Sequence, residues 1–259
     1  MIDGPAVLAA FDEQVRRRAE ADSPEERIER GEHVLSRTGP GNWQGVGWSL
    51  LDERNADAVI DAQIERFGKL GRDWEWKHYS YDTPADLPER LLAHGFRAEE
   101  PEALLFAELE NLELAPALPA GVELAAVVDE PGVAAMTSVH DAVFGGEDSG
   151  YADLLLAALA RTPPTAAAFV ALAGGEPIAA GRAQLHPGTE FASLWGGATV
   201  PAWRKRGIFR ALVAARASFA ARGGARYVQV DAAHTSQPTL ERLGFVRLAG
   251  TTPYKYSYD

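Results

Sequence analysis

The residues with the clearest chemical potential are the cations of the turn Arg204-Lys205-Arg206-Gly207-Ile208-Phe209. This turn follows an apolar, strand-like segment, Ser193–Val200, which Pro201 ends because proline has no N–H to donate to a β ladder. Apolar residues then recur at helical spacing as far as Arg222. The first N–H groups of a helix lack intrahelical partners, and the helix dipole favours negative charge there. The turn therefore predicts an anion site, since its basic residues would not favour the helix by themselves.

Gly207 supports this interpretation, because a side chain there would hold a phosphate away from the backbone amides. A P-loop would need Gly-x4-Gly-Lys-Ser/Thr, and a dinucleotide fingerprint would need three glycines after an early strand. The turn contains a single glycine, so both motifs are excluded here. The alternative is a basic helix start that only makes a surface soluble.

Composition places the chain among ordinary globular proteins. Its 259 residues, 46% hydrophobic and 24% charged, suffice for one large or two ordinary domains. The net charge of −12 and the pI of about 5.0 disfavour nucleic-acid binding. The same charge would attract a cationic substrate such as an amine.

Several other classes are excluded by what the sequence lacks. Without cysteine there is no disulfide, thiolate metal site or cysteine nucleophile. His186 and His234 have no second ligand at metal spacing, so no metal site is expected. The first residues have no basic segment before their short apolar run, and no apolar run approaches the ~18 residues of a membrane span. We therefore expect a cytoplasmic protein that binds neither membrane nor nucleic acid.

The first half of the chain reads as helices and strands in alternation. Helical patterns cover Pro5–Ala21, Ser23–Ser36 (with Ser23 as cap and Pro24 at the first position), Asp57–Lys69 and Pro84–His94. Strand patterns cover Trp43–Leu51, Trp74–Tyr81 and Ala103–Leu109, with a break at Gly39–Asn42. Residues 111–121, with two prolines and a glycine, read as a linker.

The second half starts a new alternation. The predicted order is strand Val122–Val128, helices Gly132–Phe144 and Asp148–Arg161, a hairpin of Thr165–Leu172 and Pro177–Leu185 around Gly174-Gly175, the strand, turn and helix described above, strand Tyr227–Asp231, helix Ser236–Arg242, and a closing hairpin of Phe245–Leu248 and Tyr254–Tyr258. These elements predict the α/β (α+β) class, with a mixed sheet flanked by helices.

The basic turn resembles the acyl-CoA pyrophosphate loop, Arg/Gln-x-x-Gly-x-Gly/Ala, of the GNAT (GCN5-related N-acetyltransferase) superfamily. Arg204 and Gly207 match this loop, whereas Phe209 departs from its last small position. The segment Leu240–Phe245 and the predicted closing hairpin add to the resemblance, which covers Val122–Asp259. It implies the GNAT fold, with a mostly antiparallel central sheet, and acetyl-CoA as co-substrate.

The resemblance also implies which residues hold the cofactor. The pantetheine arm would hydrogen-bond the strand at Ala198, Thr199 and Val200. The pyrophosphate would lie on the amides of Arg206, Gly207, Ile208, Phe209 and Arg210, with Arg204 at the loop start and Lys205 adding charge. Ser236, which opens the later short helix, would face the cofactor, although it could equally be the N-cap of that helix.

Direct acyl transfer to an amine needs a base for the amine proton and an acid for the leaving thiolate. Many family members place a tyrosine acid where this chain has Leu240, so water or Tyr254 would have to serve. The base candidates are Glu190, Asp231 and His234, each with an ordinary structural role as the alternative. His140-Asp141 could line the acceptor pocket or form a surface pair on their helix. The acceptor loops would include Phe144–Tyr151 and His186–Glu190.

An internal repeat links the two halves. Trp48–Leu109 has the same order of elements as the end of the chain, and Glu89–Phe96 corresponds to Thr239–Phe245. Its strand-to-helix turn, Asp52–Asp57, is acidic and would repel phosphate. We therefore predict a tandem GNAT arrangement: a degenerate GNAT-like domain at residues 1–110, a linker at 111–121 and a GNAT domain at 122–259. The alternative is an unrelated α+β extension.

Three functions are compatible with these features. The leading hypothesis is an N-acetyltransferase acting on the primary amine of a small molecule, as a monomer or homodimer. The alternatives are a non-catalytic acyl-CoA sensor and an acetyltransferase of protein N-termini or lysines.

Overall fold

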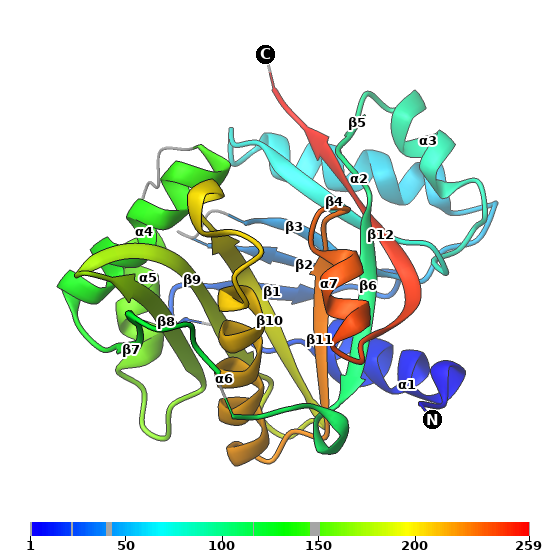
Figure 1. Ribbon diagram of the computed structural model, residues 1–259. Helices are drawn as coiled ribbons and strands as arrows, with labels where there is room; N and C mark the ends of the chain where they lie inside the picture. The colour runs from blue at the N-terminus through cyan, green and yellow to red at the C-terminus, as the bar shows by residue number, and fades with distance from the viewer. Residues whose placement is uncertain (1, 22, 40–42, 116, 146–150, 259) are drawn as a thin grey trace. The chain divides into compact units, whose positions relative to one another are not determined.

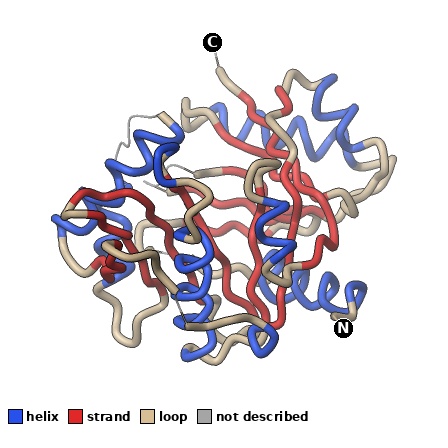
Figure 2. Tube along the Cα trace, viewed as in Figure 1, coloured by secondary structure: helices blue, strands red, loops and turns tan. Residues whose placement is uncertain are grey.

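The computed structural model describes residues 2–21, 23–39, 43–115, 117–145 and 151–258 (Figures 1 and 2). Its contacts divide the chain into two compact units. Unit 1 holds Leu105–Asp231 and Pro238–Val246, and unit 2 holds Asp3–Leu104, Ala232–Gln237 and Arg247–Asp259. Residues 40–42 of the predicted break and 148–150 of a predicted helix lie outside the described residues.

Unit 1 confirms the predicted α/β alternation of the second half. Its elements are β7 (Val122–Val127), α4 (Glu130–Phe144), α5 (Tyr151–Leu159), β8 (Ala166–Ala173), β9 (Glu176–Leu185), β10 (Phe191–Thr199), the 3-10 turn η3 (Pro201–Trp203), α6 (Ile208–Arg222), β11 (Tyr227–Ala232) and α7 (Gln237–Arg242), preceded by β6 (Glu102–Glu108) and the 3-10 turn η2 (Leu109–Asn111). The boundary between the two units falls within strand β6, whose residues from Leu105 onward belong to unit 1.

The strands of unit 1 follow the order β6-β11-β10-β9-β8-β7. Strands β7 to β10 pair antiparallel, whereas β10 and β11 pair parallel. The predicted hairpin between β8 and β9 is confirmed, and Gly174 and Gly175 both have positive φ, +58° and +87°, as a type I′ turn requires.

Helices cover both faces of this sheet. Val133, Met136 and Val139 of α4 pack with Leu155 of α5 against one face, together with Ala180. Ile208 and Leu212 of α6 pack against the other, where Ala171 and Ala179 point. Neighbouring strand residues alternate between these two clusters, as the pleat demands. The α4 and α6 side chains can therefore reach β10 from opposite faces.

Unit 2 contains a second group of strands and helices. Its elements are α1 (Gly4–Phe11), the π-helical turn η1 (Asp12–Arg17), β1 (Arg27–Arg30), β2 (Val34–Thr38), β3 (Gly45–Ser49), α2 (Ala56–Gly68), β4 (Trp74–Tyr79), α3 (Leu87–Ala93), β5 (Arg97–Ala98) and β12 (Val246–Tyr256). The strand order is β1-β2-β3-β4-β12, with β5 pairing β12. Strands β3 and β4 are parallel, like β10 and β11 in unit 1.

The predicted helix Ser23–Ser36 is wrong. Residues Arg27–Arg30 and Val34–Thr38 form the antiparallel pair β1–β2 instead. The Ser23-Pro24 signal marks a turn, in which Glu26 N–H donates to the Ser23 carbonyl. The side chains of Val34 and Leu35 are buried in the sheet, so pairing with β3 overrides the local capping signal.

The predicted closing hairpin is also wrong. Val246–Tyr256 is one strand, β12, and it pairs antiparallel with β4 through Thr251–Tyr256. The end of the chain thus completes the sheet of unit 2, while the second part of β6 belongs to unit 1. The turn-like residues before Tyr254 could not reveal this, because a strand's partner is decided by tertiary pairing.

A buried arginine bridges the diverging strands of unit 2. The pairing of β3 with β4 ends at Val46 and Trp76. Beyond it, Arg16 donates through Nε to the Gly47 carbonyl (3.2 Å) and through both Nη atoms to Asp82 (2.9 and 3.1 Å). Both side chains are only 3% exposed. Burial alone would lower the pKa of the Arg16 guanidinium, but the facing Asp82 carboxylate raises it above its ordinary value.

Arg16→Met should destabilise the protein by about 3–5 kcal/mol, because it leaves the Asp82 carboxylate buried without its counter-ion. Urea unfolding followed by tryptophan fluorescence would measure the change. The matched control is Arg17→Ala, which removes an exposed pair with Glu13 and should cost less than about 1 kcal/mol. Equal losses for the two variants would contradict the buried bridge.

Candidate functional site

The start of α6 has the geometry of an anion site. Gly207, the N-cap, has a left-handed backbone (φ +82°), and Lys205 also has a positive φ of +61°. No side chain caps the helix, and the first intrahelical bond runs from Ala211 N–H to the Gly207 carbonyl. The N–H groups of Ile208, Phe209 and Arg210 precede that bond and are therefore available to a ligand.

A cavity of about 520 Å³ adjoins this helix start, lined by Arg206, Gly207, Arg210, Thr239, Arg242 and Leu243. Among the described residues, no carboxylate forms an ion pair with these three arginines. Helix α7 supplies the second wall, where Arg242 Nη2 donates to Thr239 Oγ1 (3.0 Å). The sequence analysis missed Thr239 and Arg242, although their i, i+3 spacing puts them on one face of the predicted helix.

Strand β10 leads into this loop with one edge unpaired. Its parallel pairing with β11 ends at Ser193 and Gln229, whereas β10 continues to Thr199. Arg204, in the loop before α6, is hydrogen-bonded to the end of β10, since its Nε donates to the Thr199 carbonyl (3.0 Å). Val200 has backbone partners on both sides, since its N–H donates to the Ile178 carbonyl (3.0 Å) and its carbonyl accepts the Trp203 N–H (2.9 Å).

A chain of hydrogen-bonded polar side chains crosses β10 and β11 at their last paired residues. His186 Nε2 lies 2.8 Å from Ser193 Oγ, Ser193 Oγ donates to Gln229 Oε1 (2.8 Å), and Gln229 Nε2 donates to Asp231 Oδ1 (3.0 Å). Because the Ser193 proton goes to Gln229, His186 must be the donor to Ser193. Ser193 and Gln229 are only 1% and 2% exposed. This line holds Asp231 in place.

The structure separates the predicted catalytic residues. Asp231 follows Gln229 by two residues, so it lies on the same face of β11, beyond the last pair. Glu190 precedes β10 at its far end, about 16 Å along the strand from Trp195 by the usual rise per residue, and faces Arg226 at 3.6 Å. His234 is exposed in a segment assigned to unit 2.

Ser236 and Tyr254 also belong to unit 2. The Ser236 hydroxyl donates to the Ala233 carbonyl (3.1 Å), a turn contact, and Tyr254 lies in the aromatic core with Trp76. Burial raises the pKa of the Tyr254 hydroxyl. Leu240 is buried in α7, with 1% exposed, and offers no hydroxyl. The roles predicted for Ser236 and Tyr254 stay predictions.

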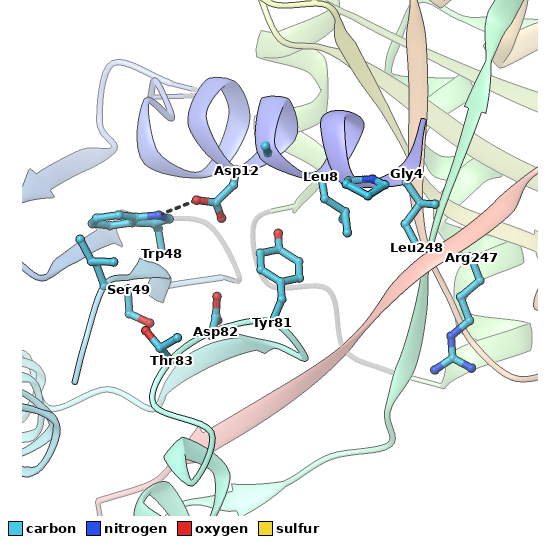
Figure 3. Close-up of a pocket in the computed structure, with 13 residues that line it drawn as sticks. Gly4, Leu8, Asp12, Trp48, Ser49, Tyr81, Asp82, Thr83, Arg247 and Leu248 are labelled. Carbon is cyan, nitrogen blue, oxygen red and sulfur yellow. Dashed lines mark hydrogen bonds between the residues drawn. The ribbon is translucent and has the colours of Figure 1, made fainter. Parts of the chain in front are cut away.

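The corresponding turn and strand divergence of unit 2 have partners within the protein. In the turn before α2 the Asp52 carboxylate accepts the N–H groups of Arg54 and Asn55 (2.8 and 3.0 Å), which lowers its pKa. Arg16 occupies the point where β3 and β4 diverge. A cavity of about 620 Å³ is lined by residues of α1 and by Trp48, Tyr81 and Asp82, and Trp48 Nε1 donates to Asp12 there (Figure 3).

Comparison with known proteins links part of the chain to a family. Residues 133–245 match the model of the Acetyltransferase (GNAT) family. The matched region lies within the second half of the chain. Among the described residues there is no group of side chains able to hold a metal ion, and no helix long and apolar enough to cross a membrane.

Solved structures extend the likeness in fold to the whole chain. A GCN5-related N-acetyltransferase from Kribbella flavida is 17% identical with a TM-score of 0.73, covering 100% of this chain and 97% of that one. A tandem GNAT protein from the clavulanic acid biosynthesis pathway is 14% identical with a TM-score of 0.63, covering 98% and 93%. A Sphaerobacter thermophilus GCN5-related N-acetyltransferase is 16% identical with a TM-score of 0.61, covering 98% and 95%. No curated protein matches the chain.

Ser193→Ala should destabilise unit 1 by about 1–3 kcal/mol, because Gln229 Oε1 would lose its donor while buried. Chemical denaturation would measure the loss. Ser218→Ala is the control, since the Ser218 hydroxyl makes its contact with Arg222 at the exposed end of α6. A Ser193→Ala variant as stable as Ser218→Ala would contradict the buried line of hydrogen bonds.

Proposed function

We propose that this protein is an N-acetyltransferase that transfers an acetyl group directly from acetyl-CoA to a primary amine of a small molecule. The observation that carries the proposal is the uncapped start of α6, where free N–H groups and three arginines without a carboxylate partner face one cavity. A structure leaves such groups unsatisfied where a polyanion completes them.

The residues present fit the pyrophosphate of acetyl-CoA. The amides from Arg206 to Arg210 would receive its oxygens, with the guanidinium groups of Arg210 and Arg242 on either side. The unpaired edge of β10, at Ala198 and Thr199, offers backbone groups to the amide-containing arm. Acetyl-CoA, when bound, supplies an activated acetyl thioester.

Asp231 is the base that the geometry supports best. It follows the end of the β10–β11 pairing and is oriented by Gln229, whereas Glu190 lies at the other end of β10. In this position its carboxylate would take the proton from an amine that approaches the open edge of β10. With Leu240 at the usual tyrosine position, water would protonate the departing thiolate.

The first half would then be a degenerate second copy in a tandem arrangement. The last strand of the chain, β12, belongs mainly to unit 2, and the second part of β6, from the first half, belongs to unit 1. The repeat β3-α2-β4-α3 matches β10-α6-β11-α7 in order, including the parallel pair. In the first copy an acidic turn with Asp52 precedes the helix, where a phosphate would be repelled, and Arg16 lies where the two strands diverge. These features disfavour a nucleotide in this copy.

The acceptor is proposed as a small amine because the net charge of −12 attracts cations. The buried Leu240 favours a non-catalytic acyl-CoA sensor as the second candidate. Acetylation of a protein N-terminus or lysine is a third outcome of the same assay.

Gly207→Glu should weaken acetyl-CoA binding by about 100-fold, because it puts a carboxylate beside the amides that the pyrophosphate needs. Isothermal titration calorimetry of the full chain with acetyl-CoA measures this. The matched control is Gly224→Glu at the other end of α6, where φ is +84° and no atom lies within 4 Å of an added Cβ. It carries the same backbone strain without the phosphate site. Absence of binding by the wild type would contradict the proposal.

Asp231→Asn should lower kcat by about 100-fold or more, because the amide cannot accept the proton. Release of free CoA thiol across a panel of amines and peptides measures turnover. The chain contains no cysteine, so every thiol detected comes from CoA. Tight binding with no release over the whole panel would favour the sensor, and release with peptides alone would favour a protein acceptor.

A further inference from the structure

Strand β10 contains a bulge in its unpaired part. The register with β9 shifts between Trp195 and Ala198, so Gly196 and Gly197 stand outside the regular ladder. Gly196 has a left-handed backbone, with φ +59°. Both glycines lie beyond the last β11 pair at Ser193. The bulge therefore turns backbone groups out of the sheet where the acyl group would arrive.

His140, on α4, holds the bulge from one face. Its Nε2 lies 2.8 Å from the Gly196 carbonyl oxygen. A carbonyl only accepts, so this nitrogen carries the proton. A Cβ at position 196 would lie 2.9 Å from His140 Cε1, which leaves room for glycine alone. The pocket and surface roles considered for His140 from the sequence stay predictions, and the structure adds a bond from its ring to strand β10.

Arg216, on α6, holds the bulge from the opposite face. It is 2% exposed, and its Nη1 and Nε donate to the carbonyls of Trp195 (3.4 Å) and Leu212 (3.1 Å). Burial lowers the pKa of its guanidinium to about 10, so it stays charged at neutral pH. Gly181 and Gly197 make room for it, since a Cβ at either would lie within 3.2 Å of the guanidinium. A charge buried this deeply is costly and calls for a specific role.

The two contacts set the direction of two consecutive amides. In a planar trans peptide the N–H points opposite to the carbonyl of the preceding residue. When His140 draws the Gly196 carbonyl toward α4, the Gly197 N–H is directed away from α4. When Arg216 draws the Trp195 carbonyl toward α6, the Gly196 N–H is directed away from α6. The bulge is thereby fixed from both faces of the sheet.

We propose that His140 is a positioning residue for acyl transfer: its bond to the Gly196 carbonyl aims the Gly197 N–H at the thioester carbonyl oxygen. The inference rests on the proposed function and adds a residue to it. A preformed donor of this kind stabilises the charge that develops on that oxygen. His140 acts through the peptide and exchanges no proton with the amine.

The test compares His140→Gln with His140→Met. Glutamine keeps a side-chain N–H donor at similar reach, and methionine removes it. We expect kcat for thiol release to fall about 100-fold in the methionine variant and to recover to within about fivefold of wild type with glutamine. The Kd for acetyl-CoA by calorimetry should stay within about twofold in both. Ser138→Ala, an exposed change on the same helix, is the control.

A second measurement does not depend on turnover. The NMR resonance of the Gly197 amide should move in His140→Met and return toward its wild-type position in His140→Gln. Wild-type kcat and an unmoved resonance in the methionine variant would overturn the proposal. Equal loss of activity with both variants, and a changed pH profile, would identify His140 as a base instead. If the wild type binds no acetyl-CoA, the proposed function fails, and the Gly197 resonance still decides whether His140 orients this peptide.

Discussion

The early end of the parallel pairing between β10 and β11 is the constraint on which the site depends. Hydrogen bonds between these strands stop at Ser193 and Gln229, and six further residues of β10 keep one edge free. Backbone groups at this depth need partners, so an unpaired edge persists only where a ligand or a side chain completes it. Unit 1 leaves this edge open, and the Ser193–Gln229 hydrogen bond joins the two strands at the point where their pairing ends.

Each unit contains a parallel strand pair whose pairing ends early, and the two units differ in what lies beyond that point. Unit 2 also has a parallel pair that diverges, but Arg16 takes the freed Gly47 carbonyl, and the Asp52 carboxylate accepts two N–H groups of the turn before the following helix. Unit 1 has neither device: α6 begins uncapped, and the arginines around it lack carboxylate partners among the described residues. The chain is acidic overall, but a ligand at contact distance interacts mainly with the nearest charges. The arginines around this cavity therefore decide which charge binds there.

Much of the fold could be predicted from the sequence. The β8–β9 hairpin, the strand–turn–helix at Ser193–Arg222 and the acidic turn at Asp52 follow from local patterns, and all are present. The helix expected at Ser23–Ser36 failed because a cap signal cannot register that Val34 and Leu35 are needed in a sheet. In the site, the anion-binding loop was predictable from residue types, whereas the α7 wall with Arg242 and the line from His186 to Asp231 needed side chains brought together from separate strands and helices.

The sequence by itself predicted an anion site at Gly207, because a glycine and cations at a helix start act through neighbours in the chain. It also determined the contrast between the basic and the acidic turn. Only the tertiary structure decided that β12 joins the sheet of unit 2, that Asp231 rather than Glu190 follows the open edge, and that His140 and Arg216 reach the bulge from opposite faces. These are pairings between residues far apart in the chain, which no local pattern encodes because strand register and helix packing are settled by the whole core.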